Sequence, residues 1–424
     1  MMKERRVPPA AIIAWGLVIF TCMTMIPFID RSKHPHLFLA VIAIAAATYI
    51  RILFLLDSVS WGSRRALVLS LALAASWRVP LLLMPPTLSS DVYRYVWDGR
   101  IQRRGYDPYL IVPSDRAHQE LHTAETRRMN HPALPTPYPA GAELFFRGVM
   151  TINESARMMK SALAVCDAAS AMVLLSWLLN SGRNPWWVLA YAWNPLVSLE
   201  GAGNGHVDLL GTLCLLLMAF SLSRGKRTIA ALALALGVAV KFLPVVVLPL
   251  FWRRIGIRDA ALALAVLIAL YLPFLNSRGL PVGSLWVYFA WWRINGPLYR
   301  ALEYVIPNNA LVALPAALGF AVAVWTNSHW AIDSPETWAW PIATALLFAP
   351  TVFPWYLVWL TPFLFSPRTL PLAVWSVSAL AVYSSLADWA VRVVEYGAVA
   401  IAIGWMVTQR ATTPDRICGS QAQR

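Results

Sequence analysis

The sequence is poor in charge. Charged residues make up 13% of its 424 positions, about half the share found in an ordinary soluble domain. Apolar residues make up 58%, and 21 positions are Trp. So little charge excludes a soluble enzyme, and so much apolar material excludes a disordered chain. The composition predicts a polytopic membrane protein whose apolar stretches recur along the whole length.

Cysteine is also scarce. The four cysteines are Cys22, Cys166, Cys214 and Cys418. No two of them stand at a spacing typical of a metal site, a redox motif or a haem attachment, which excludes a disulfide scaffold and a structural zinc site. The sequence also shows no internal repeat and no low-complexity tract.

Nucleotide-binding loops are missing as well. Glycines alternate within Glu200–Asp208, but their spacing is not that of a dinucleotide loop and no strand precedes them. In the same segment His206 and Asp208 would need a third ligand to hold a metal ion, and none stands at a motif spacing. We therefore expect no cofactor and no metal.

Positive charge is in excess, with 35 Lys and Arg against 21 Asp and Glu and a net charge of +14. The basic residues form short clusters between apolar runs: Lys3–Arg6, Arg64–Arg65, Arg224–Arg227 and Arg253–Arg258. This distribution is typical of the positive-inside rule, so we expect no nucleic-acid partner. The first apolar run, 10–29, is too long for a signal peptide and lacks a cleavage site. We interpret it as a first membrane helix whose N-terminus is cytoplasmic.

The remaining apolar runs predict an all-α fold: one integral membrane domain over residues 1–424 with roughly 12–13 transmembrane helices in the inner or plasma membrane. The long polar segment 86–158 is expected to be an external loop carrying short helices. The stretch 228–252 is interrupted at Lys241–Pro244 and flanked by basic clusters at both ends. We interpret it as two short broken helices that return to the cytoplasmic side, because a single span would place the second cluster outside. Every unusual polar motif then emerges on the outer face.

The most informative motif runs from Ser89 to Arg100. Its first residues can cap a helix. On that helix Asp91, Arg94 and Asp98 share one face, because residues three and four apart are neighbours on a helix surface. An ordinary surface helix with an Arg94–Asp98 ion pair is the alternative. The position of the helix directly after a membrane exit favours a functional site.

Asp91–Arg100, followed by Gly105–Tyr109, resembles the first external loop of GT-C glycosyltransferases. These are polytopic enzymes that use polyprenyl-phosphate sugars, and they include the mannosyltransferases of glycosyltransferase family 87. Further segments resemble later motifs of that group in the same order: Asn130–Pro132 with Pro135–Pro139, Trp193–Pro195 with Glu200–Asp208, Lys241–Pro244, Trp292–Gly296 and Pro350–Tyr356. One departure is Phe353, where many relatives have His, which argues against a proton or phosphate role at that position.

The resemblance implies transfer of a hexose, mannose first, from a polyprenyl-phosphate sugar donor to a lipid or glycan acceptor at the outer face. The donor, the acceptor and membrane lipids are the implied partners. Such a reaction needs a carboxylate that takes the acceptor proton and cations that stabilise the departing phosphate. We expect Asp91 to be the base because it stands where a lipid-borne sugar would arrive. Asp98 is the second choice.

The other site residues follow from the same chemistry. Cations expected at the donor phosphate are Arg78, Arg94, Arg100, Lys241 and Arg293. Arg78 and Lys241 lie within apolar runs, where a cation marks a polar site unless it snorkels to the surface, and Asp167 is a possible partner for one of them. Residues expected at the sugar or acceptor are Tyr95, His131, Tyr138, His206, Asp208, Asn295, Trp355 and Tyr356.

Three other functions compete with this interpretation. A transporter or flippase of lipid-linked sugars would need polar residues on both membrane faces, whereas the predicted topology gathers them on one. An aminoarabinose-type lipid-modifying transferase would share the fold and the donor chemistry. A membrane scaffold would leave the cations within the apolar runs unexplained.

Overall fold

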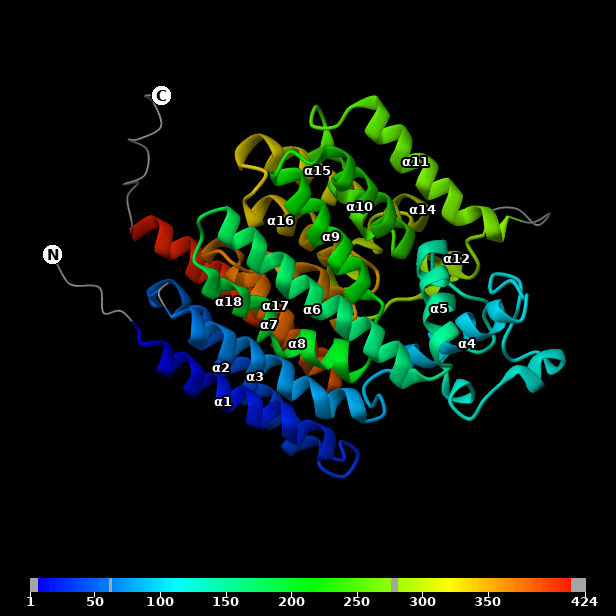
Figure 1. Cartoon of the computed structure of the whole chain (residues 1–424), viewed down its shortest axis with the longest axis horizontal. Helices are drawn as coiled ribbons and strands as arrows, with labels where there is room; N and C mark the ends of the chain where they lie inside the picture. Colours follow the sequence, from blue (N-terminus) through cyan, green and yellow to red (C-terminus); the bar gives the residue numbers. More distant parts are fainter. Residues whose placement is uncertain (1–6, 61–62, 276–280, 413–424) are drawn as a thin grey trace.

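The computed structural model describes residues 7–60, 63–275 and 281–412. Within these ranges the chain is helical and contains no strand, which confirms the all-α prediction (Figure 1). The basic cluster Lys3–Arg6 and Cys418 lie outside the described residues. The helices up to the middle of the chain are α1 (Pro9–Met25), α2 (Pro35–Leu53), α3 (Arg64–Leu83), α4 (Asp91–Arg103), α5 (Ala140–Ile152), α6 (Ala156–Asn180), α7 (Val188–Ala192), α8 (Pro195–Ser198), α9 (Asp208–Ser223) and α10 (Arg227–Val240).

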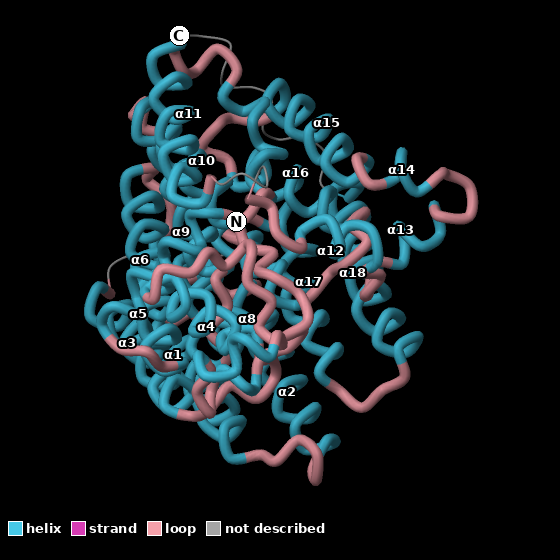
Figure 2. Tube along the Cα trace, turned by 90° about the vertical axis from the view of Figure 1, so that its right-hand side faces the viewer, coloured by secondary structure: helices cyan, strands magenta, loops and turns pink. Residues whose placement is uncertain are grey.

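The second half of the chain adds helices of very different lengths. They are α11 (Ile257–Tyr271), α12 (Leu285–Trp291), α13 (Pro297–Leu302), α14 (Asn308–Leu311), α15 (Leu314–His329), α16 (Pro335–Leu347), α17 (Leu370–Ser378) and α18 (Asp388–Thr412), with 3-10 segments η7 (Leu243–Phe251) and η9 (Pro354–Phe363) among them. Figure 2 shows the short helices α13 and α14 projecting from one side of the bundle.

Six helical stretches among the described residues are long and apolar enough to cross a membrane. They are Pro9–Phe28, Pro35–Leu53, Arg64–Leu83, Ala156–Asn180, Ile257–Phe274 and Asp388–Gln409. Several present large apolar side chains outward, such as Val165 and Met172 on α6. Lipid accepts such a surface and water does not, so the chain is an integral membrane protein. The other predicted crossings are shorter or broken segments.

The apolar segment 186–199 is one of these broken segments. It divides into a 3-10 turn, α7, α8 and a π-helical turn at Leu199–Gly203. Its aromatic side chains Tyr191 and Trp193 are fully buried, and a Cβ at Gly16 on α1 would collide with the Trp193 ring. Irregular backbone is tolerated at membrane depth where protein surrounds it, as here.

The stretch 228–252 is interrupted at the predicted position. Helix α10 ends at Val240, Lys241 is extended with φ −160° and ψ 141°, and η7 continues from Leu243. Pro244 explains why α10 ends at Val240, because in a continued helix its ring would clash with the carbonyl of Val240, four residues earlier, and it has no N–H to donate to that carbonyl.

The two ends of this broken stretch lie together. The Thr228 hydroxyl, at the start of α10, donates a hydrogen bond of 2.6 Å to Asp259, at the start of α11. The basic clusters Arg224–Arg227 and Arg253–Arg258 therefore lie at the same end of the molecule. This is the arrangement expected of two short segments that turn back, whereas a single crossing would separate the clusters.

The long segment 86–158 forms a helical layer at the opposite end. Helix α4 packs against α5, and both lie beside the N-terminal part of α6. Figure 1 shows this layer at the right of the view, away from the two chain termini at the left. The layer covers the point where α3 leaves the bundle, and it builds one wall of a cavity.

Candidate functional site

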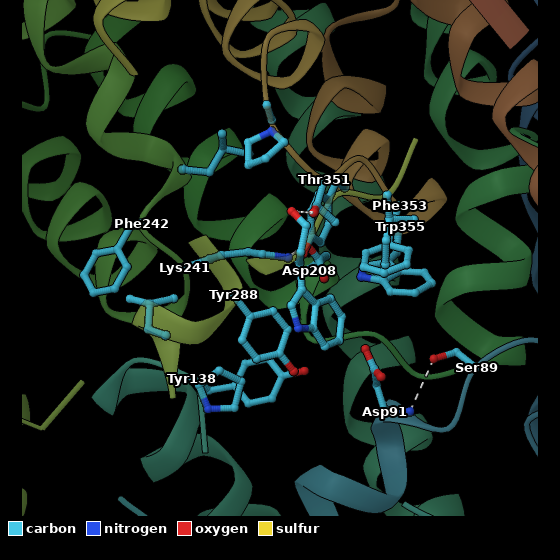
Figure 3. Close-up of a pocket in the computed structure, with 18 of the residues that line it drawn as sticks. Ser89, Asp91, Tyr138, Asp208, Lys241, Phe242, Tyr288, Thr351, Phe353 and Trp355 are labelled. Atoms are coloured by element: carbon cyan, nitrogen blue, oxygen red, sulfur yellow. Dashed lines mark hydrogen bonds and ion pairs between the residues drawn. The ribbon is translucent and has the colours of Figure 1, made fainter. Parts of the chain in front are cut away.

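A cavity of about 1060 Å³ lies between the 86–158 layer and the helix bundle. Its walls come from the start of α4, the loop at 128–139, the start of α9, the break at Lys241, helix α12 and the turn before η9. The structure brings eight of the predicted site residues to its lining: Asp91, His131, Tyr138, Asp208, Lys241, Arg293, Trp355 and Tyr356 (Figure 3). They come from segments far apart in the sequence.

Asp91 is the first residue of α4, and its side chain is 13% exposed. Asn130 donates a hydrogen bond of 2.6 Å to Oδ1, and Nδ1 of His206 lies 3.7 Å from Oδ2. Burial raises the pKa of Asp91, while the Asn130 hydrogen bond and the charge of Lys241 oppose that increase. The carboxyl group is thus held by an amide and not by an arginine, and its raised pKa suits a group that accepts a proton.

Asp208 lies across the cavity at the first turn of α9. Its Oδ1 accepts hydrogen bonds of 2.6 Å from both Nζ of Lys241 and Nε1 of Trp359. Its Oδ2 is buried and has no hydrogen-bond partner within the described residues. A buried oxygen without a partner is costly. Because Asp208 lines the cavity, this oxygen can accept a hydrogen bond from a bound hydroxyl group.

Lys241 therefore pairs with Asp208 and not with Asp167. Its ammonium group also lies 3.8 Å from the centroid of the Tyr356 ring, a cation–π contact. The break between α10 and η7 places this lysine at the cavity wall. The ion pair adds no net charge to the site.

His206 lies behind the cavity and is fully buried. Its ring stacks on Trp355 at 4.1 Å, and Trp355 stacks on Phe353 at 4.3 Å. Burial lowers the pKa of His206 well below its usual value. Oε2 of Glu200 lies 3.3 Å from Nε2 of His206. His206 is thus a neutral ring that supports the Trp355 wall.

The part of the chain that the structure describes contains no group of three or more His, Cys, Asp and Glu side chains able to hold a metal ion. His206 has Asp91 and Glu200 as its nearest carboxylates.

The opposite end of the cavity is apolar. Its lining there consists of aliphatic and aromatic residues from η7, α12, α15 and α16: Phe242, Leu243, Val245, Val246, Leu285, Val312, Pro315, Ala316, Ala345 and Leu346. One continuous cavity thus joins a polar end, which carries Asp91 and Asp208, to an apolar end. Such a cavity suits an amphipathic ligand.

Several predicted site residues lie outside this lining. Arg94 and Asp98 form a buried ion pair, with Nε 3.0 Å from Oδ1, and Arg94 also donates to the backbone oxygen of Leu134. The alternative role of Asp98, as the partner of Arg94, is the one that the geometry shows. The Tyr95 hydroxyl is buried, 3.4 Å from that of Tyr138.

Three more predicted residues have partners away from the cavity. Arg78 donates to Asp167 at 2.6 Å and to two backbone oxygens. Arg100 pairs with Glu154, a carboxylate that also receives Arg103 and Arg104. Asn295 is buried and donates to Glu395 at 2.7 Å. Arg293 does line the cavity and pairs with Glu303.

The sequence interpretation did not select several polar residues that line the cavity, among them Arg128, Asn130 and Tyr288. Asn130 belongs to the Asn130–Pro132 motif, so the resemblance offered a signal for it. Arg128 is one of many arginines in a polar loop, and Tyr288 lies in a Trp-rich run, so neither stood out.

Comparison with known proteins places the chain in a family. A family model described as alpha-(1->6)-mannopyranosyltransferase, N-terminal domain, matches residues 12–255. Alpha-(1->6)-mannopyranosyltransferase A of Mycobacterium tuberculosis is 24% identical over 333 residues, which cover 67% of this chain and 62% of that protein. A second alpha-(1->6)-mannopyranosyltransferase of the same organism is 47% identical over 38 residues, 9% of this chain and 6% of the relative. No solved structure matches.

The matched region 12–255 is more than half of the chain. It contains both carboxylates of the cavity, the loop that holds Asp91, and the break at Lys241. The predicted resemblance to GT-C mannosyltransferases is therefore confirmed, and the chain belongs to the alpha-(1->6)-mannopyranosyltransferase family.

Proposed function

We propose that this protein transfers mannose from a polyprenyl-phosphate donor to a lipid or glycan acceptor at the outer face of the membrane, with Asp91 as the general base. The observation that carries the proposal is the single cavity with a polar and an apolar end. A lipid-linked sugar has the same division, with a sugar phosphate at one end and an isoprenoid chain at the other. Family membership supports mannose and the α-(1→6) linkage.

In this reaction the acceptor hydroxyl attacks the anomeric carbon of the donor sugar. The bond from that carbon to the phosphate oxygen breaks, and the electron pair leaves with the lipid phosphate. The acceptor proton passes to Asp91, which is buried but free of a salt-bridging arginine within the described residues. Lys241 and Arg293, which line the cavity, stabilise the departing phosphate.

The sugar ring binds between the two carboxylates. Oδ2 of Asp208 accepts a hydrogen bond from a sugar hydroxyl, which gives this buried oxygen the partner that it lacks. The flat wall of Trp355 and Phe353 offers an apolar face to the ring. Its stack on the neutral His206 keeps that wall rigid.

The proposed orientation places the N-terminus in the cytoplasm and the loop 86–158 outside. It is supported by the basic clusters, which lie together at the end opposite that loop. Single cysteines at the exposed residues Ala117 and Gly225, in a variant without the native cysteines, test it with a membrane-impermeant reagent. Intact cells should label Ala117 and leave Gly225 unlabelled. The opposite pattern would reject the orientation.

The function itself is tested with purified protein in lipid nanodiscs. A synthetic polyprenyl-phosphate mannose and a short α-(1→6)-mannoside are supplied, and the product is identified by mass spectrometry and NMR. GDP-mannose and a polyprenyl-phosphate glucose serve as competing donors. We expect an α-(1→6) product from the lipid-linked mannose. Transfer from GDP-mannose alone would contradict the proposed donor, and movement of donor across a vesicle membrane without product would favour a flippase.

A further inference from the structure

Three lysine and arginine side chains line the described part of the cavity: Arg128, Lys241 and Arg293. Lys241 is neutralised by Asp208, and Arg293 is neutralised by Glu303. Each of these pairs adds no net charge. The cation that remains uncompensated is Arg128, which the sequence interpretation did not select.

Arg128 lies on the loop that holds Asp91. Its guanidinium group lies 4.7 Å from the centroid of the Tyr93 ring. The residue is exposed, and its guanidinium group forms no hydrogen bond or ion pair with any residue that the structure describes. Two positions later, Asn130 donates to Asp91, so the arginine stands at the polar end of the cavity.

Tyr93 provides a second unmet donor at the same place. It lines the cavity, it is 3% exposed, and its hydroxyl has no hydrogen-bond partner in the described chain. Buried hydroxyls in folded proteins are nearly always bonded, because an unmet donor is costly. A ligand with acceptor oxygens would satisfy both the hydroxyl and the guanidinium.

We propose that Arg128 and Tyr93 form a binding subsite for the phosphate group of a lipid substrate. The planar guanidinium fork matches two phosphate oxygens, and a hydroxyl beside it matches a third. This subsite deepens the proposed function and rests on it for the identity of the lipid. The phosphate has two sources, the polyprenyl-phosphate donor and an acceptor phospholipid, and the experiment distinguishes them.

The test compares Arg128→Gln, Arg128→Lys and Tyr93→Phe with wild type in nanodiscs. Arg127→Gln is the matched control, because Arg127 is exposed like Arg128 but does not line the cavity and bonds to Gln119. Two readouts are taken. One is direct binding of polyprenyl phosphate and of phosphate-free polyprenol, and the other is the transfer rate against donor and acceptor concentration.

We expect Arg128→Gln to weaken binding of polyprenyl phosphate, or to raise the KM for a phospholipid acceptor, roughly ten- to hundredfold, as for loss of a charge-assisted hydrogen bond. Arg128→Lys should retain part of the wild-type affinity, and Tyr93→Phe should lose affinity a few-fold. Arg127→Gln should bind the lipid phosphate like wild type. Binding of polyprenol should be the same in every variant. Donor binding identifies the donor phosphate, and an effect on acceptor KM alone identifies the acceptor. Unchanged binding and unchanged KM values in Arg128→Gln overturn the subsite. Because binding is measured without turnover, a protein that binds the lipid but transfers no mannose would contradict the proposed function alone.

Discussion

Two positions of α4 carry the same kind of side chain in opposite surroundings. Asp91, at the first position, borders the cavity and is held by the amide of Asn130. Asp98, two turns later, is completely buried and bound to the guanidinium of Arg94. One carboxylate borders the cavity, where it can exchange a proton with a ligand, and the other is bound by a buried arginine. Position relative to the cavity, and not residue type, separates their roles.

The buried side chains around Asp98 position the loop that holds Asp91. Glu143 accepts hydrogen bonds from Thr136 at 2.6 Å and from Gln102 at 2.8 Å. Burial and then the charge of Asp98 raise the pKa of Glu143 well above its usual value, which favours the protonated form. Through Thr136, and through the Arg94 bond to Leu134, this cluster holds the loop that carries Asn130. The buried cluster around Asp98 thus supports the site around Asp91.

The largest expected effect on the transfer rate is at Asp91, which borders the cavity. Asp91→Asn keeps the shape of the side chain but cannot take a proton, so the transfer rate should fall by about 10²–10⁴. Thermal unfolding should change little. The measurement is the initial rate with lipid-linked mannose, beside a melting curve of the same sample. Near-normal turnover would remove Asp91 from the role of base.

At the buried position, Asp98→Asn should destabilise the fold. It leaves Arg94 buried without its carboxylate, which costs about 3–5 kcal/mol in other proteins. Denaturant or thermal unfolding in detergent measures the loss, and the double variant Arg94→Met with Asp98→Asn should recover part of it. A stable but inactive Asp98→Asn protein would exchange the roles of the two carboxylates.

The pH dependence of the transfer rate distinguishes Asp91 from Asp98 further. Asp91 acts as a base only when deprotonated, and burial raises its pKa. Activity should therefore be lost as the pH falls through that raised pKa, about tenfold in kcat/KM per pH unit below it. Asn130→Ala removes a hydrogen bond that lowers the pKa, so the profile should move to higher pH. A profile that is unaffected in Asn130→Ala would show that another group controls it.

Across the cavity, Lys241→Met should weaken use of the donor by roughly tenfold, the scale of one charged hydrogen bond. It also leaves Asp208 without its cation, so some stability is lost. Adding Asp208→Asn should restore the stability but not the donor use. Donor titrations and melting curves of the single and double variants measure both. Unchanged donor kinetics in Lys241→Met would make the lysine a structural partner only.

The smallest effect is expected for Glu143→Gln. A protonated glutamic acid and a glutamine are both neutral, so the change should cost less than about 1 kcal/mol and leave the pH profile in place. Glu143→Ala, which leaves Thr136 and Gln102 without an acceptor, should cost more. Melting curves of the two variants make the comparison. A large loss in Glu143→Gln would mean that this carboxyl group is charged.

The sequence by itself determined the class of the protein. Low charge and long apolar runs are properties of the local chain, and they specify helices in a membrane wherever the neighbours lie. The interruption at Lys241 is equally local, because Pro244 prevents the helix from continuing past the residue four positions before it. The motif beginning at Asp91 was visible for the same reason. These features depend on neighbours in the sequence and not on how the helices pack.

Only the tertiary structure decided which charges meet each other and which face the cavity. Arg78 finds Asp167 and Lys241 finds Asp208, in each case from a different helix. No spacing rule predicts such pairs, because they depend on how the helices pack. Arg128 was hidden among many arginines until the fold showed that it lines the cavity without a carboxylate partner in the described chain. A charge near a membrane must be neutralised or hydrated, and packing alone determines which partner is within reach.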